Sequence, residues 1–168
     1  MSHFLNRAPA GFIGAITRPL DTVVESAMMN PDPDKVPEAF GDAVKMVDGK
    51  LERMATGDTG DKVYGVLART TPSIAGDMGQ SFASAKPNPL QLQSVVVKGY
   101  VNVACKTGGQ PVRGTPAFIR INASASGVEY PGMWSAKKSS NNFSEVPGSI
   151  WADTGKDGSL IAELRLGI

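Results

Sequence analysis

Three stretches in the last third of the chain alternate apolar and polar residues, and this alternation constrains the fold more than any other feature of the sequence. Successive side chains of a β-strand point to opposite faces of a sheet, so a period of two predicts strands with one buried face. The apolar faces are Val95, Val97, Val101 and Val103; Ala117, Ile119 and Ile121; and Leu160, Ala162, Leu164 and Leu166. The opposite faces are Lys98, Tyr100 and Asn102; Phe118, Arg120 and Asn122; and Glu163 and Arg165. We therefore predict an all-β fold, a single β-sandwich or barrel-like domain with long loops.

Shorter β signals precede these stretches. From Ala43 to Met54 the pattern predicts a hairpin around Asp48-Gly49, a dipeptide favoured by tight turns that need positive φ at both central positions. The strand predicted over 62–69 is apolar on both faces, which indicates a central strand covered on each side. Residues 21–30 fit neither the helix period nor the strand period, so an edge strand and one short helix are both open.

The 168 residues suit one domain with an arm. We place an extended N-terminal arm at residues 1–20 and a β-rich domain at residues 21–168. Gly and Pro interrupt the arm, yet it carries four large apolar side chains, Phe12, Ile13, Ile16 and Leu20, which are candidate contacts. The arm either lies across its own domain or docks on another chain, and the sequence leaves both alternatives open.

Residues 70–92 form the least regular region of the chain. A stretch of about 20 residues without periodicity is typical of a functional loop or of a segment ordered by a partner. Its candidate contact residues are Pro72, Met78, Phe82 and Pro87.

Residues that carry catalysis or ligand binding are scarce. The 17 basic and 16 acidic residues give a formal net charge of +1, and the longest basic run is Lys137-Lys138, so we expect no nucleic-acid partner. With His3 as the single histidine and Cys105 as the single cysteine, we expect no catalytic pair, no metal site and no cofactor. Three acidic residues in separate contexts are expected to face solvent: Glu129, Asp153 and Glu163. Because the single histidine lies near the N-terminus and no carboxylate pair is placed on recognisable strand ends, we expect no enzyme. No stretch is apolar over the length that spans a bilayer, so we expect no membrane partner.

The order of short motifs resembles the structural cement, or head decoration, proteins of tailed bacteriophages. The motifs are residues 7–14, 16–18, 22–26, 39–44, 63–72, 97–103, 114–120 and 151–163. They are built from Gly, Pro, Val and aromatic residues, so the resemblance rests on their order along nearly the whole chain.

The resemblance implies an accessory protein that binds the outer surface of the major capsid protein lattice and stabilises the head. It implies a virion location after synthesis in the bacterial host cytoplasm, and no catalytic residues. We expect a homo-oligomer, with a trimer favoured over a dimer, in which the arm residues and the loop at 72–87 contact the capsid or a neighbouring subunit.

Two other functions are open at the level of sequence. A tail or head-fibre component of the same class of virion would also be β-rich and present in many copies. A carbohydrate-binding β module would use exposed aromatic rings as a stacking platform, for which Tyr130, Trp134 and Trp151 are the candidates.

Overall fold

This computed structural model describes residues 12–69, 86–154 and 161–167. In that part of the chain the regular elements are strands and two 3-10 helices. They are η1 Pro19–Asp21, β1 Val23–Met28, β2 Ala43–Val47, β3 Lys50–Arg53, η2 Gly60–Lys62, β4 Gly65–Ala68, β5 Leu92–Thr107, β6 Pro116–Arg120, β7 Trp134–Ser135, β8 Phe143–Trp151 and β9 Ile161–Leu166. The predicted all-β fold with a barrel-like core is confirmed.

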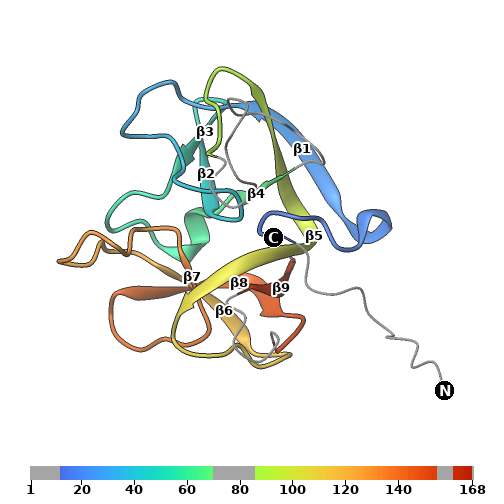
Figure 1. Ribbon diagram of the computed structural model, residues 1–168, viewed down its shortest axis with the longest axis vertical. Helices are drawn as coiled ribbons and strands as arrows, with labels where there is room; N and C mark the ends of the chain where they lie inside the picture. Colours follow the sequence, from blue (N-terminus) through green and yellow to red (C-terminus); the bar gives the residue numbers. More distant parts are fainter. Residues whose placement is uncertain (1–11, 70–85, 155–160, 168) are drawn as a thin grey trace.

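The long strand β5 belongs to both halves of the molecule and runs between them in Figure 1. Its first half lies between β1 and β4, and the sheet continues from β4 through β2 to β3. A bridge between Met29 and Leu51 links the end of β1 to β3, so this upper half curls into a small barrel. The second half of β5 lies between β7 and β9, and the path β7–β6–β8–β9 returns to β5, which closes a second barrel.

Each barrel has its own apolar interior, and β2, β4 and the first half of β5 form the layer between them. The interior of the upper barrel is Met29, Val44, Leu51, Leu67 and Val95. The larger cluster includes Val66 of β4 and Val96 of β5 and continues into the lower barrel around Ile119, Trp134 and Leu164. Every residue of β4 is buried, which confirms the prediction of a central strand covered on both faces.

The prediction that the four valines of β5 share one face is wrong. Val95 and Val97 pack in the upper cluster, whereas Val101 and Val103 belong to the larger cluster, together with Val96. The side-chain alternation therefore shifts by one residue between Val97 and Val101. The pairing with β1 shifts at this point, since Val24 lies opposite Val96 but Val23 lies opposite Lys98. Gly99 follows with φ of 115°, and a Cβ there would come within 2.5 Å of the Thr22 Cα atom, so the position requires glycine.

The local turn chemistry predicts the other early elements correctly. Asp48 and Gly49 have φ of 49° and 74°, so the hairpin of β2 and β3 turns where the sequence places it. Residues 23–28 form a strand that pairs with β5, which settles the choice between edge strand and helix. The strands β7 and β8 lie in a region for which no strand was predicted.

A charged cluster fastens the loop after β3 to the rest of the fold. The Asp58 carboxylate accepts hydrogen bonds from the Lys45 and Lys62 ammonium groups at 2.6 and 2.9 Å and from the Ala55 N–H at 2.8 Å. Burial alone would raise the pKa of Asp58, but these hydrogen bonds outweigh it and lower the pKa to about 2. The ionised carboxylate is therefore stabilised by the folded state.

Replacing Asp58 by Asn removes that stabilisation. A carboxyl pKa lowered from 3.8 to about 2 corresponds to about 2 kcal/mol of folding free energy. This contribution is complete above pH ~4 and is lost as the pH falls towards ~2, because the unfolded chain binds the proton first. We expect Asp58→Asn to lower the unfolding free energy by about 2 kcal/mol at pH 7, and the deficit to shrink with acid in urea titrations. The exposed Asp34→Asn is the control, and an equal deficit at pH 7 and pH 2 would contradict the assignment.

Ile119 of β6 is fully buried in the larger cluster, as its alternation predicts. Ile119→Asp places an unpaired carboxylate in that interior, so we expect a loss of about 4 kcal/mol or more and no cooperative unfolding transition. Circular dichroism during denaturant titration measures this. Val112→Asp, at a side chain 54% exposed, is the matched control and should unfold like the parent protein.

Candidate interaction surface

The cations that line one cleft of the described residues are paired with carboxylates. A cleft of about 490 Å³ lies between residues 34–56 and residues 123–131, and its cations already have partners. Lys35 pairs with Glu52 at 3.2 Å, and Arg53 with Glu38 at 3.1 Å. Among the described residues no group of three or more His, Cys, Asp or Glu could hold a metal ion. Nor does the described part contain a helix long and apolar enough to cross a membrane.

Cys105 lies in the larger core cluster, with 2% of its surface exposed. Burial raises the pKa of its thiol to about 11, so the thiolate needed for nucleophilic attack is scarce at neutral pH. The residue acts as a small apolar side chain of the barrel interior.

The second half of the arm lies on its own domain. Residues 14–17 run along the middle of β5: the Gly14 N–H donates to the Asn102 carbonyl at 2.7 Å, and the Asn102 N–H donates to the Ala15 carbonyl at 2.9 Å. Ile16 bridges to Val101 and packs against the larger core cluster. These arm residues therefore pair with the edge of β5 around residues 100–102, where the strand passes from one barrel to the other.

A buried carboxylate holds the end of the arm. Glu163 of β9 is 3% exposed, and it accepts hydrogen bonds from the Thr17 hydroxyl at 2.6 Å and from Arg18 Nη2 at 3.0 Å. The guanidinium also lies over the Tyr100 ring, 4.0 Å from its centroid, and hydrogen bonding to Glu163 raises the pKa of Arg18. We refer to Thr17, Arg18, Tyr100 and Glu163 as the arm latch.

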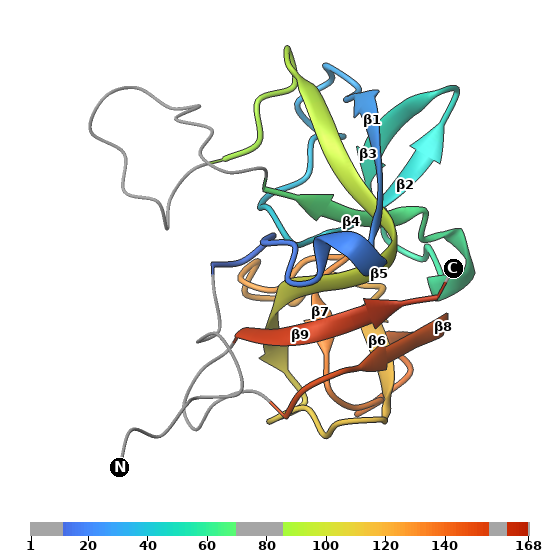
Figure 2. The same cartoon turned by 90° about the vertical axis from the view of Figure 1, so that its right-hand side faces the viewer.

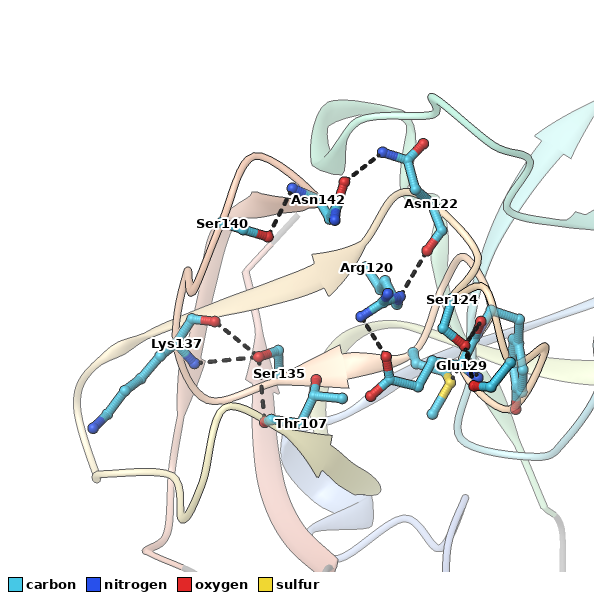
Figure 3. Close-up of polar contacts among 12 residues, drawn as sticks. Thr107, Arg120, Asn122, Ser124, Glu129, Ser135, Lys137, Ser140 and Asn142 are labelled. Carbon is cyan, nitrogen blue, oxygen red and sulfur yellow. Dashed lines mark hydrogen bonds and ion pairs between the residues drawn. The ribbon is translucent and has the colours of Figure 1, made fainter.

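The expectation that Glu163 faces solvent is therefore wrong, because its charge is compensated inside the fold by a residue of the arm. Glu129 is also paired: its carboxylate lies 2.6 Å from Arg120 Nη1 (Figure 3). Figure 3 shows that the neighbouring loops are held by their own polar groups, such as the Ser124 hydroxyl, which accepts from the Glu129 N–H at 3.0 Å.

The proposed aromatic platform is not formed. Trp134 and Trp151 are 1% and 0% exposed, and the Trp134 indole N–H donates to the Gly41 carbonyl at 2.9 Å. The Tyr130 hydroxyl donates to the Asp42 carboxylate at 3.0 Å. With both indole rings inside the core, these side chains offer no joint stacking surface for a sugar.

The arm candidates do not form one patch. Ile13 and Ile16 are partly buried, whereas Phe12 is 39% exposed and Leu20 is fully exposed on η1. Of the candidate loop, Pro87 is buried, and Pro72, Met78 and Phe82 lie outside the described residues. Only Phe12 and Leu20 are thus placed as exposed apolar contacts.

A second exposed apolar surface was not predicted. It consists of Val24 and Met28 on one face of β1 with Leu92 at the start of β5, and we refer to it as the β1 surface. Met28 lies directly opposite Leu92 in the sheet. Figure 2 shows β1 facing the viewer beside the upper half of β5. The spacing of Leu90 and Leu92 in the sequence could have indicated an earlier start of β5.

Comparisons with known proteins agree with this architecture. The sequence matches the family described as structural cement protein (E217 gp24/Pam3 gp6) over residues 3–167. No curated protein matches it. A chain in the solved structure of the capsid of Myoviridae phage XM1 has a similar fold, with a TM-score of 0.67 and 15% sequence identity. That similarity covers 98% of this chain and 94% of the phage XM1 chain.

The arm latch predicts a specific effect of Glu163→Gln. The amide keeps an acceptor for Thr17 but loses the charge that holds Arg18, so we expect about 1–3 kcal/mol less stability for the docked arm. Amide hydrogen exchange at Gly14 and Thr17 should become about tenfold faster or more, because their hydrogen bonds to β5 open more often. Glu145→Gln, on an exposed position of β8, is the control. Unchanged exchange in Glu163→Gln would show that backbone pairing alone holds the arm.

Proposed function

This chain belongs to the phage structural cement protein family, and we propose from that premise that it binds the outer surface of the major capsid protein lattice and stabilises the head. The match over residues 3–167 carries the proposal, since it includes both barrels and most of the arm. In this proposal the protein is synthesised in the host cytoplasm and is located on the outer surface of the virion capsid.

The geometry supports a role based on surfaces. The buried apolar residues form two barrel interiors. The exposed apolar side chains lie on the arm, η1, β1, the start of β5 and short loops. The role is structural rather than catalytic, and no cofactor or nucleic acid takes part in it. A seam between capsid subunits needs such surfaces and no enclosed pocket.

The contact with the major capsid protein involves the arm. Leu20 is the most exposed large apolar side chain of the described residues, and Phe12 lies at the other end of the docked segment, against Arg69. Burying a leucine fully is worth about 1.5–3 kcal/mol. The many copies on a shell multiply such modest contacts into firm attachment.

The copies also contact one another. Capsid threefold positions led us to favour a trimer over a dimer, but symmetry arguments alone do not choose between them. A tail or head-fibre component is the alternative, and a tail component would not bind expanded capsids.

Binding to purified expanded capsids that lack this protein tests the proposal. We expect the parent chain to bind and Leu20→Lys to bind about tenfold more weakly, because the charge would have to be desolvated at the contact. Because Leu20 is fully exposed, we expect the variant to fold like the parent chain, and urea titration checks this. Val128→Lys, at a side chain 73% exposed, is the matched control.

The outcomes separate the parts of the proposal. If the parent chain fails to bind expanded capsids but binds tails, the cement function is wrong. If the parent chain binds and Leu20→Lys binds equally well, the function holds and the contact does not include η1. A chain without residues 1–11 then tests the first half of the arm.

A further inference from the structure

The strand β1 has an open edge within the part of the chain that the structure describes. One edge pairs with β5 over residues 23–28, and only Met29, after the strand, bridges to Leu51. Val23, Val24 and Met28 are 50%, 39% and 42% exposed. A six-residue edge with apolar side chains is a template for pairing with another strand.

This edge lacks the usual protection against pairing. It contains no Pro and no Lys, the residues that commonly blunt an edge strand. Its one charged side chain, Glu25, accepts a hydrogen bond from the Tyr64 hydroxyl of the same chain. The charge of β1 is therefore directed at its own domain rather than across the edge.

The sequence of β1 is complementary to itself in one register. Two copies related by a twofold axis keep each side chain on its own face, so residues of like parity must lie opposite each other. A register centred on Glu25 would put two carboxylates directly opposite, which is unfavourable. A register centred on Ser26 instead places Val24 opposite Met28 and Glu25 opposite Ala27.

The neighbouring strand extends this complementarity. Within one chain Leu92 lies opposite Met28, Ser94 opposite Ser26, and Val96 opposite Val24. In the Ser26 register a row across the four strands therefore reads Leu92, Met28, Val24 and Val96. The central row contains serine only: Ser94, Ser26, Ser26 and Ser94. Both rows match apolar with apolar and hydroxyl with hydroxyl, as favourable cross-strand pairs do.

We propose that the open edge of β1 binds a second copy of this chain, by antiparallel pairing of β1 with β1 about a twofold axis at Ser26. The inference deepens the proposed function, since it names one contact between the copies on the shell. An isologous contact of this kind closes with two chains, so it builds a dimer rather than the trimer favoured above.

Disulfide trapping tests the register. In the proposed pair the two Ser26 Cα atoms lie about 4.5–5.5 Å apart, within the range that a disulfide spans. Ser26→Cys should form a covalent dimer under mild oxidation. Val24→Cys should not, because the two Val24 positions are offset by about 13 Å along the strands. Ser139→Cys is a control on an exposed loop, and the native Cys105 is buried.

A charge exchange tests the pairing without a covalent bond. Ser26→Lys puts two ammonium groups face to face, so we expect the dimer dissociation constant from sedimentation to rise about tenfold or more. An equimolar mixture of Ser26→Lys and Ser26→Glu should restore association, whereas Ser139→Lys should leave it unchanged.

Three outcomes would overturn the inference: a parent chain that forms no dimer, or forms a trimer, at the highest concentration that sedimentation reaches; no faster crosslinking of Ser26→Cys than of Ser139→Cys; or no recovery in the mixture. All three measurements use the isolated chain, so they are independent of capsid binding. A chain that binds capsids but does not pair through β1 would keep the proposed function and lose this contact.

Discussion

Hydrogen bonding along both edges of β5 holds the molecule together, because the same strand is a wall of two barrels. Its first half carries β1 and β4, and its second half carries β9 and β7. The level between them is completed by residues 14–17 of the arm. A strand with neighbours at every level is well fixed in position, so surfaces on either barrel keep a defined relation to each other. That rigidity is what a protein needs if it is to bridge neighbouring subunits of a shell.

Elements set by local chemistry were predictable from sequence, and elements set by distant partners were not. The Asp48-Gly49 hairpin and the doubly buried β4 follow from turn preference and apolar pattern alone. The valines of β5 were assigned to one face because the irregularity between Val96 and Lys98 arises in the pairing with β1, which the alternation does not reveal. Glu163 appeared to be a solvent-facing residue because its partner, Arg18, lies 145 positions away. Pro147 and Gly148 interrupt the alternation of apolar and polar residues in β8, so the periodicity did not predict this strand.

The division of the arm between fold and surface follows from the same contacts. Residues 14–17 are committed to β5 and to the arm latch, so their apolar and hydrogen-bonding groups are used inside the domain. Leu20 follows the latch directly and projects from η1, where the chain turns into β1. The latch therefore does more than hold the arm: it fixes the point from which η1 and β1 present their exposed apolar side chains. The position of β1 therefore depends on the arm, because η1 connects the arm latch to β1.

An unprotected edge strand is a hazard for a free protein and an advantage for one that works in many copies. Pairing residues 24–28 at each edge gives a modest free energy, since the serine row at its centre buries little apolar surface. On a shell, however, attachment to the lattice raises the effective concentration of neighbouring copies, so a modest contact becomes well populated. The same reasoning explains why Glu25 is bound to Tyr64: a charge held by its own domain leaves the edge free to pair. In the proposed pair, the pattern of the edge favours a partner with the same pattern, which another copy of the chain provides.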